Sequence, residues 1–559
     1  MKSILEEAIK NALTELGLDH VDFVVEHPSD MAHGDYATNV AMVLAKKAGR
    51  NPRELAEDII AALDGKVAAV AQLELAGPGF INVHLTRDFF TEQIVYANKE
   101  GAQWGSNDIA SETEVVLEYT SPNLFKPLHI GNLVGNIIGE SLTRLFENAG
   151  ATLYRLNYPS DIGPVVAKGV WGLKYRGLNP DNIEDLGRAY VAGNEAYEAG
   201  GAQKEEIDAV NRALYAGDDD ALNALRARGI ATSRARLAEI CTELGTHFDF
   251  EILESESGPI GSEIVKKHVD DVFEVSDGAV VYRGEQVGLH TRVFINSQGL
   301  PTYEAKDLGN FTIKQKKYPN WTHSIIVTGG EQAEYFKVLY ASIRALWPEA
   351  KAKNLEHIPT GFLTLTTGKM SSRKGNVLTG ESLLAELKEA VQERAAASRA
   401  EDVEKLASQL AVGALKFQIL KQKVGMNIVF DKGRALSFEG DSGPYVQYTH
   451  ARISSLIQKA DAEGITAHYN TVPDTTYAIE KFLYRFNEVT SMALEAREPH
   501  HLVTYLLEIA SAFNTFYAQE KIADADDAYA PYKLALTQAV GQTIKNGLWM
   551  LGIEAPERM

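Results

Sequence analysis

Residues 121–132 read Ser-Pro-Asn-Leu-Phe-Lys-Pro-Leu-His-Ile-Gly-Asn, and this stretch decides the fold of the central part of the chain. The apolar run at 115–117 (Val-Val-Leu) predicts a buried parallel strand before it. Apolar residues at helical spacing over 134–146 predict a helix after it. A strand, a loop and a helix N-terminus therefore follow one another. Free backbone N–H groups and the helix dipole at His129 and Gly131 would favour a bound phosphate.

A simpler interpretation of the same turn is a tightly packed helix with a structural histidine, which is the more common meaning of a lone His-x-Gly. Gly131, Gly135 and Gly139 recur every four residues and give a bare ridge that another backbone or a flat ligand could approach. A second element is therefore needed to decide between packing and phosphate binding.

That second element is residues 368–376, which read Gly-Lys-Met-Ser-Ser-Arg-Lys-Gly-Asn. Three cations, two hydroxyls and flanking glycines indicate a loop that binds polyphosphate, although a basic surface turn is the alternative. It is not a Walker loop, because position 363 is Leu instead of Gly and Met370 follows the lysine.

Together, the His-x-Gly turn and the distant Lys-Met-Ser-Ser loop resemble the two ATP-binding motifs of class I aminoacyl-tRNA synthetases. The long form of the first motif, over 121–132, resembles the version found in the arginyl-tRNA synthetase family. Four other stretches resemble the same family, at 33–39 (His-Gly-Asp-Tyr-Ala-Thr-Asn), 77–82 (Gly-Pro-Gly-Phe-Ile-Asn), 442–448 (Ser-Gly-Pro-Tyr-Val-Gln-Tyr) and 552–559 (Gly-Ile-Glu-Ala-Pro-Glu-Arg-Met). The similarity runs from about residue 33 to the last residue.

The resemblance implies a multi-domain α/β protein. Its domains would be an N-terminal α+β domain at 1–105 that contacts the tRNA elbow, a Rossmann-like catalytic domain at 112–385 with a helical insertion at about 170–265, and an all-α anticodon-binding bundle at 386–559. The insertion is equally compatible with a solvated helical hairpin and with a role in gripping the acceptor stem.

Local patterns predict the elements inside these domains. Helices are expected at 3–17, at 37–48 and after Pro52, strands at 73–76 and 80–85, a linker at 101–105, and β-rich runs of a parallel sheet at 278–282, 291–295 and 324–327. From about 385 onward the pattern is helical.

The resemblance also implies an activity, namely ATP-dependent activation of L-arginine to arginyl-adenylate and transfer to the 3′ end of tRNA(Arg), with activation that depends on bound tRNA. The first step is an in-line displacement at phosphorus, so positioning and charge stabilisation dominate. Mg²⁺ would accompany ATP, and no permanently bound metal is expected. The catalytic residues would be His129, Lys126, Lys369, Arg373 and Lys374, and the ATP-binding residues would be His129, Gly131, Asn132, Lys369, Met370, Ser371 and Ser372.

Two positions depart from the family pattern. Asn132 stands where the first motif usually ends in a second histidine, and an amide can hydrogen-bond a ribose or phosphate oxygen but cannot carry charge. Ser372 stands where the second motif usually has a second lysine, and we expect Arg373 or Lys374 to replace it.

A guanidinium substrate needs planar carboxylate partners, which Glu118 and Asp307 could supply. By resemblance, the arginine site would consist of Glu118, Ser121, Asn123, Tyr303, Asp307 and Gln332. Without the resemblance, Tyr303 and Asp307 would be an ordinary i, i+4 helix pair and Glu118 a strand-end acid.

Contacts with tRNA are expected in two regions. By resemblance, Phe80 and Asn82 would meet the tRNA elbow. Tyr445, Gln447, Tyr448 and Arg452 combine aromatic rings with hydrogen-bonding groups, which suits unpaired anticodon bases, although a bundle core would also explain them.

Composition narrows the possible functions. The 559-residue chain has a net charge of −21, which argues against general adhesion to nucleic acid and favours selective RNA binding through local basic patches. No apolar stretch is long enough to span a membrane, and the first residues do not resemble a signal peptide. The single cysteine, Cys241, fits a reducing compartment, so we expect a cytoplasmic protein. We also expect a monomer, although the sequence itself does not reveal the oligomeric state.

Three other functions compete with this interpretation. A glutamyl or glutaminyl synthetase would need a cation where this chain has Glu118 and Asp307. A small-molecule nucleotidyltransferase would not need the helical C-terminal third. A catalytically inactive paralogue that only binds tRNA is kept open by Asn132 and Ser372.

Overall fold

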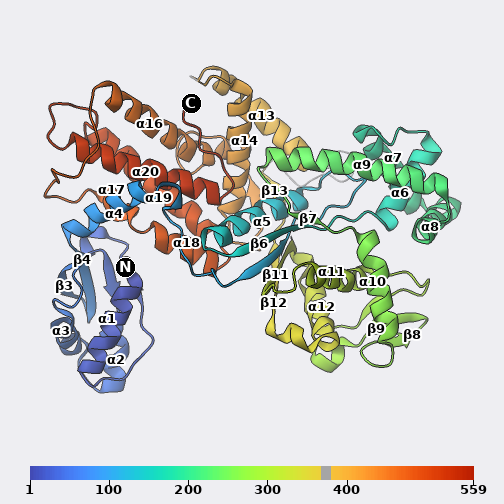
Figure 1. Ribbon diagram of the computed structural model, residues 1–559, viewed down its shortest axis with the longest axis horizontal. Coiled ribbons are helices and arrows are strands. Elements are labelled where there is room, and N and C mark those ends of the chain that lie inside the picture. The colour runs from blue at the N-terminus through green and yellow to red at the C-terminus, as the bar shows by residue number, and fades with distance from the viewer. Residues whose placement is uncertain (367–378, 399) are drawn as a thin grey trace. The chain divides into compact units, whose positions relative to one another are not determined.

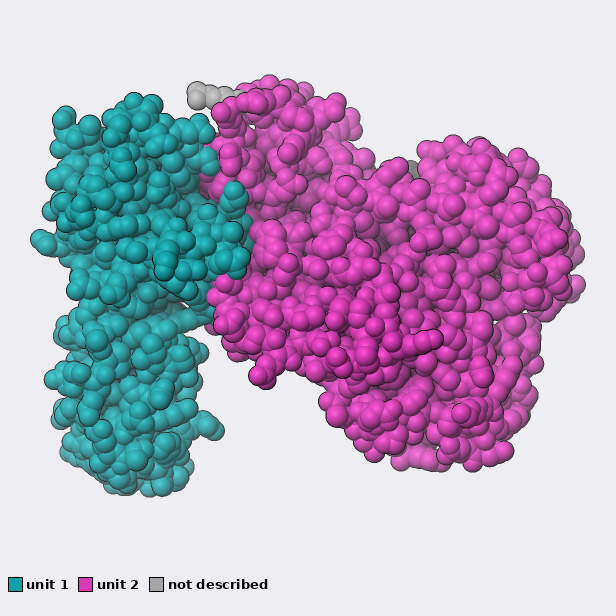
Figure 2. All heavy atoms as spheres, in the orientation of Figure 1, with its two compact units in different colours: residues 1–105, 452–489, 508–546 teal, residues 106–451, 490–507, 547–559 magenta. Residues whose placement is uncertain are grey.

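The computed structural model describes residues 1–366, 379–398 and 400–559. The chain forms two compact units, which Figure 2 colours separately. Unit 1 consists of residues 1–105, 452–489 and 508–546, and unit 2 consists of residues 106–451, 490–507 and 547–559. Across the residues described, no helix combines the length and the apolar character needed to cross a membrane.

The N-terminal part of unit 1 is an antiparallel sheet in the order β1-β2-β4-β3 with three helices that share its core. These elements are α1 (Lys2–Glu15), β1 (Val25–Glu26), β2 (Tyr36–Thr38), α2 (Val40–Ala48), α3 (Pro52–Leu63), β3 (Val70–Ala76) and β4 (Phe80–Leu85). The helices predicted at 3–17 and after Pro52 and the two predicted strands are confirmed. The helix predicted at 37–48 begins only at Val40, because Tyr36–Thr38 pairs with β4.

The turn between β3 and β4 requires a glycine in the Gly-Pro-Gly stretch at 77–79. Gly79 has φ of 135°, and a Cβ there would lie 2.9 Å from the Cβ of Pro52. Only glycine fits both the backbone conformation and this close approach.

The linker predicted at 101–105 is wrong. Trp104 is fully buried in unit 1, and its indole Nε1 donates to Oγ1 of Thr543 at 2.9 Å. The segment follows α4 (Arg87–Glu100) and packs against C-terminal residues of the same unit, since a Cβ at Gly105 would collide with the ring of Phe486. Local composition could not reveal a packing partner nearly 400 residues away in sequence.

A buried ion pair also ties α4 to the C-terminal part of unit 1. Arg87 donates to both carboxylate oxygens of Glu480, at 2.6 and 3.2 Å, and to the hydroxyl of Tyr532. Glu480 lies in α17 (Ala478–Leu483). Because the guanidinium donates to both carboxylate oxygens, this ion pair is favoured over the two side chains being separately solvated.

Unit 2 is built on a five-stranded parallel sheet with the order β12-β11-β5-β6-β7. Its strands are β5 (Glu114–Glu118), β6 (Thr152–Asn157), β7 (Phe250–Glu251), β11 (His323–Gly329) and β12 (Asn354–Thr360). The strand expected at 115–117 and the one at 324–327 are confirmed as β5 and β11, and the helix after the opening motif is α5 (Ile130–Asn148). The strand order reverses between β5 and β11, which is where ligands bind in open parallel sheets.

The β-rich runs at 278–282 and 291–295 do not join this sheet, contrary to the prediction. They form a separate antiparallel sheet, β10-β9-β8, from β8 (Glu274–Ser276), β9 (Ala279–Tyr282) and β10 (Arg292–Ile295). Short strands reveal their own conformation in the sequence but not their partners.

Four helices lie between β6 and β7 and share a hydrophobic core of their own. They are α6 (Pro164–Arg176), α7 (Ile183–Ala199), α8 (Gly201–Ala216) and α9 (Asp220–Glu243), and Figure 1 shows them grouped in green shades. Next along the chain are α10 (Glu254–Lys267), α11 (Tyr303–Lys317) and α12 (Ala333–Leu346). Helix α10 packs tightly on α11.

Among the described residues from 380 onward, the regular elements are helices apart from one strand. Its elements are α13 (Gly380–Ala396), α14 (Val403–Leu420), β14 (Ile428–Phe430), α15 (Lys432–Ala435), α16 (Gly443–Ala462), α17, α18 (Phe486–Glu495), α19 (His500–Gln519) and α20 (Ala530–Met550). The unpredicted β14 pairs in parallel with β13 (Leu363–Leu365).

A buried lysine holds the C-terminal residues in unit 2. Lys416 of α14 donates to the carbonyl oxygens of Leu244 at 2.6 Å and Gly552 at 2.7 Å. Burial, together with the nearby Arg144, lowers the pKa of Lys416 to about 7. This lysine therefore donates hydrogen bonds to two backbone carbonyls that would otherwise be buried without a donor.

Candidate active site

A pocket of about 380 Å³ opens where β5 and β11 end. All six residues expected to bind arginine line it, together with eight others, and the full set is Glu118, Ser121, Asn123, Tyr158, Ser160, Glu254, Arg292, Tyr303, Asp307, Thr328, Glu331, Gln332, Tyr335 and Phe336. The parallel sheet explains this convergence, because the carboxyl ends of its strands meet at one edge.

Glu118 is the last residue of β5 and is buried. Its Oε2 accepts hydrogen bonds from Asn310 Nδ2 at 3.0 Å and from Lys314 Nζ at 3.2 Å. Both donors lie on α11, so the carboxylate is fixed in position and its charge is compensated.

Asp307 lies on the same helix and has a different environment. Its Oδ2 accepts a hydrogen bond from the hydroxyl of Tyr335, and Asp307 forms no ion pair with any residue of the described ranges. Burial and the neighbouring charge of Glu118 raise the pKa of Asp307 to about 8. The pocket thus contains an acid that is largely protonated when no cation is present.

A third acid of the pocket, Glu254, begins α10 and is buried against α11. It pairs with Lys306 and accepts a hydrogen bond from Ser160 Oγ at 2.9 Å. The helices can approach because they meet at glycines: a Cβ at Gly261 would lie 1.6 Å from the carbonyl oxygen of Ala305. This contact sets the position of the α11 side chains at the pocket.

Eight of the lining residues were missed by reasoning from the sequence. Tyr158 and Ser160 follow the end of β6, so the rule about strand ends could have found them. Glu331 adjoins the predicted Gln332. Arg292, in contrast, lies on the separate antiparallel sheet, and nothing in the sequence places that sheet beside the pocket.

His129 is the N-cap of α5, and its Nδ1 accepts the backbone N–H of Gly131 at 3.1 Å. A ring nitrogen that accepts an N–H carries no proton, so the neutral ring bears its proton on Nε2. Burial and the nearby Lys126 lower the pKa of His129, which favours the neutral ring. The residue can therefore donate one hydrogen bond to an oxygen beyond the helix end.

Two of the three glycines on the α5 ridge are covered by protein. A Cβ at Gly139 would lie 2.4 Å from the ring of Tyr119, and one at Gly135 would lie 3.6 Å from the carbonyl oxygen of Val327. Of the three glycines, only Gly131 is exposed. The ridge brings the helix close to β5 and β11, and Gly131 alone has room for a ligand.

Asn132 also faces the protein. Its Nδ2 donates to the carbonyl oxygen of Thr120 at 2.8 Å. The amide expected to meet ATP thus holds the loop that leaves β5.

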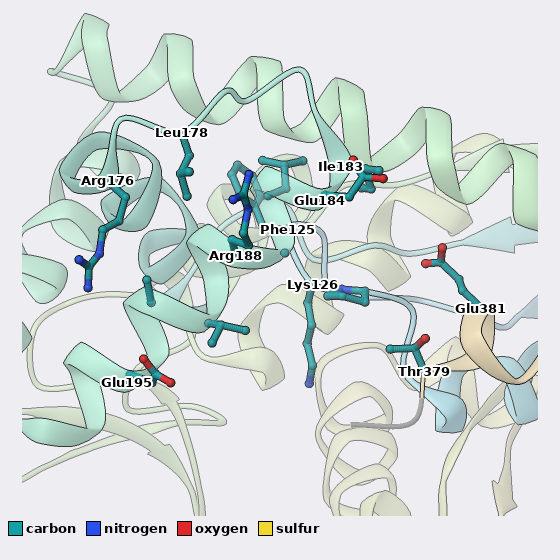
Figure 3. Close-up of a pocket in the computed structure, with 15 residues that line it drawn as sticks. Phe125, Lys126, Arg176, Leu178, Ile183, Glu184, Arg188, Glu195, Thr379 and Glu381 are labelled. Atoms are coloured by element: carbon teal, nitrogen blue, oxygen red, sulfur yellow. The ribbon is translucent and has the colours of Figure 1, made fainter. Parts of the chain in front are cut away.

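Lys126 lines a second pocket, of about 850 Å³. Figure 3 shows its side chain extending between the insertion helix that carries Arg188 and the segment that carries Thr379. The second pocket also contains Arg176, Glu184, Glu195 and apolar side chains of the insertion. Burial lowers the pKa of Lys126.

The loop at 368–376 lies outside the described residues, and with it Lys369, Met370, Ser371, Ser372, Arg373 and Lys374. Among the residues that the structure does describe, no group of three or more His, Cys, Asp and Glu side chains is arranged to hold a metal ion.

The residues expected to contact tRNA differ in accessibility. Gln447 is fully buried, and its Nε2 donates to the carbonyl oxygens of Gln409 at 3.1 Å and Glu554 at 2.9 Å. Asn82 is buried within β4. We therefore correct the assignment of Gln447 to a structural role, because a fully buried and hydrogen-bonded amide has no surface to present to RNA, whereas the assignment of Asn82 stays a prediction.

The other four candidates retain accessible surface. Phe80 and Tyr445 are half-buried, and Tyr448 is exposed. In unit 1, Arg452 lies over the ring of Tyr517, with its guanidinium carbon 5.3 Å from the ring centre.

Three protein-family models match the chain in order along its sequence. The Arginyl tRNA synthetase N terminal domain matches residues 3–85, the tRNA synthetases class I (R) catalytic domain matches residues 94–432, and the DALR anticodon binding domain matches residues 446–559. The catalytic-domain match alone covers more than half of the chain.

The chain belongs to the arginyl-tRNA synthetase family.

Full-length relatives agree with this assignment. Arginine–tRNA ligase 1 of Bacillus cereus is 30% identical over 574 residues, with 100% of each chain covered. The arginine–tRNA ligase of Clostridium perfringens is also 30% identical, again over 100% of each chain. The solved arginyl-tRNA synthetase of Thermus thermophilus superposes with a TM-score of 0.82 at 26% identity, with 100% of both chains covered.

Family membership confirms the expected architecture, with an N-terminal domain, a parallel-sheet catalytic domain and a C-terminal helical domain. It also removes the glutamyl, glutaminyl and nucleotidyltransferase alternatives. The matches span the whole chain, including the helical C-terminal third that a small nucleotidyltransferase would not need.

Proposed function

We propose that the 380 Å³ pocket binds the arginine substrate of this enzyme and that Asp307 and Glu118 hold its guanidinium. The chain is an arginine–tRNA ligase, which activates arginine with ATP and transfers it to tRNA. The observation that carries the pocket assignment is Asp307, a carboxyl group without an ion pair among the described residues, close enough to Glu118 to raise its pKa. A planar cation placed there would complete the charge balance of the pocket.

The other end of the substrate would meet the loop after β5. Ser121 Oγ is buried and has no hydrogen-bond partner among the described residues, so a ligand can supply one. Asn123 lines the same wall. We assign the α-amino and carboxylate groups of arginine to Ser121 and Asn123, with Tyr303 and Gln332 completing the pocket.

ATP would lie at the N-terminus of α5. The His129 Nε2–H is suited to a phosphate or ribose oxygen, the missing side chain at exposed Gly131 leaves room for the ligand, and Lys126 is close enough to lower the pKa of His129. We assign the opposite side of the phosphates to Lys369, assisted by Arg373 or Lys374, and we expect Mg²⁺ to arrive bound to ATP. The carboxylate of arginine attacks the α-phosphorus, and pyrophosphate leaves.

His129→Ala is expected to lower kcat for arginyl-adenylate formation about 10²-fold, the usual loss when one donor to a charged transition state is removed. It would also destabilise α5 by about 1 kcal/mol, because the helix loses its cap. His129→Ser is the matched variant, since serine caps a helix well but cannot reach the phosphates. We expect melting temperature to recover in the serine variant and kcat to remain low. Recovery of kcat with the cap would contradict the assignment.

For tRNA, we propose that the 850 Å³ pocket beside Lys126 receives the acceptor end. Its mixture of apolar side chains with Arg176 and Arg188 suits unpaired nucleotides. We assign the elbow contact to Phe80 and the anticodon contact to Tyr445, Tyr448 and Arg452. We further infer that the enzyme works in the cytoplasm as a monomer, and light scattering would test the monomer.

ATP–pyrophosphate exchange, measured with each amino acid separately, tests the proposed function. We expect exchange with arginine alone, and only when tRNA(Arg) is present. Exchange with glutamate or glutamine in place of arginine would contradict the pocket assignment. Tight tRNA binding without exchange or charging would indicate an inactive paralogue.

A further inference from the structure

The loop between β5 and α5 has an unusual backbone. Thr120 and Ser121 have φ of 75° and 38°, in the left-handed region that residues with side chains seldom adopt. Of the six non-glycine residues with positive φ in the described ranges, three lie within 120–125. Such conformations are unfavourable and persist only where surrounding contacts hold them.

Two asparagines on α5 provide those contacts. Asn132 Nδ2 donates to the carbonyl oxygen of Thr120 at 2.8 Å, and Asn136 Nδ2 donates to its hydroxyl at 2.9 Å. Thr246 in turn donates to Asn136 Oδ1 at 3.0 Å. Both the backbone and the side chain of Thr120 are thereby fixed to the first turns of α5.

The conformation of Thr120 determines where the next residues of the loop, which line the 380 Å³ pocket, lie. Ser121 follows directly, with its buried hydroxyl lacking a partner among the described residues, and Asn123 follows two residues later. A change in the conformation of Thr120 would move both side chains. The precision of this pocket wall therefore depends on the two amides of α5.

We propose that Asn132 is a positioning residue for the amino-acid substrate. It acts through Thr120 on Ser121 and Asn123, and the arginine side of the site depends on it more than the ATP side. This inference rests on the proposed function of the pocket. Asn132 stands where the family usually has a histidine, and this proposal gives the asparagine a specific role. Its side-chain amide is short and donates directly to the Thr120 carbonyl.

Arginine titration in the absence of ATP separates the two possible roles of Asn132. Asn132→Asp has the same shape but replaces the N–H donor with an oxygen facing the Thr120 carbonyl. We expect it to weaken arginine binding at least about tenfold, because small misplacements of binding groups have effects of that size or larger. In the exchange assay, KM for ATP is expected to change less than about threefold. Asn132→Ala, which adds no charge, should weaken arginine binding in the same direction and decides the matter if the aspartate variant does not fold.

The matched control is Asn148→Asp, the same chemical change at the other end of α5. It is expected to keep arginine affinity within about twofold of the unaltered protein. A rise in KM for ATP with unchanged arginine affinity would overturn the proposal and assign Asn132 to ATP. Unchanged values for both substrates would also overturn it. Failure of the unaltered protein to bind arginine would instead contradict the proposed function of the pocket.

Discussion

Asp307→Asn is expected to weaken arginine binding by at least about 10²-fold while leaving KM for ATP nearly unchanged. An asparagine at this position retains the size of the side chain and can still accept a hydrogen bond from Tyr335. It cannot supply the negative charge that a guanidinium needs in a partly buried pocket, where charge-assisted pairs contribute most. Titration calorimetry with arginine measures the loss directly.

The pH dependence of binding follows from the raised pKa. Asp307 has a pKa of about 8 in the empty pocket, so at pH 7 most molecules carry a proton there. A bound guanidinium favours the ionised carboxylate, so arginine binding should release close to one proton at pH 7 and fewer at pH 9. Titrations in two buffers with different ionisation enthalpies report this number. The asparagine variant should release none.

The same shift predicts an effect on stability. Because the folded-state pKa of Asp307 lies above its ordinary value of 3.8, the folded protein holds a proton that the unfolded chain loses as the pH rises. The stabilisation from that proton is full below about pH 4 and is lost as the pH rises through about 8. Asp307→Asn cannot ionise, so without arginine it should melt at a higher temperature than the unaltered protein at pH 8.

Asp270→Asn is the matched control for this change. Asp270 is exposed and has φ of 72°, a conformation that asparagine also tolerates. It should leave arginine affinity and proton release unaltered. An Asp307→Asn variant that still bound arginine with full affinity would show that another group recognises the guanidinium.

Gly261→Ala is expected to destabilise the enzyme by about 3 kcal/mol and to weaken arginine binding as well. The added methyl group would lie 1.6 Å from the carbonyl oxygen of Ala305, and backbone cannot rotate away as a flexible side chain can. Helices α10 and α11 would have to separate. That movement would carry Asp307 and the donors to Glu118 away from the pocket.

Gly187→Ala provides the control for stability. This glycine also lies within a helix, but among the described residues a Cβ there would meet only Pro127, at an ordinary 3.9 Å. Alanine is the better helix former by about 1 kcal/mol, so melting temperature should stay or rise. Equal melting temperatures for the Gly261 and Gly187 variants would contradict the role assigned to the α10–α11 contact.

Much of the catalytic core could be predicted from the sequence because its signals are local. The buried run at 115–117, the turn and the amphipathic helix after it located β5 and α5 correctly along the sequence. Parallel pairing then accounts for the strand ends lying together. That unit places Glu118 at the end of β5 and Ser121 and Asn123 in the loop after it, but their assignment to arginine binding came from the family resemblance. Tyr303, Asp307 and Gln332 required the family resemblance, because an i, i+4 pair on a helix indicates nothing about what it faces.

The parts that could not be predicted depend on distant partners. Arg292 reaches the pocket from an antiparallel sheet whose strands give no sign of their pairing. Trp104 resembles a linker residue until its partner Thr543 is known, and Gln447 resembles an RNA contact until Gln409 and Glu554 are seen to bind it. In each case the residue type was compatible with two roles, and tertiary packing chose between them.

A crystal structure of the enzyme with bound arginine tests the central claim most directly. We predict the guanidinium between the carboxylates of Asp307 and Glu118, with the α-amino and carboxylate groups at Ser121 and Asn123. Arginine bound in the reverse orientation, or in the 850 Å³ pocket beside Lys126, would contradict it.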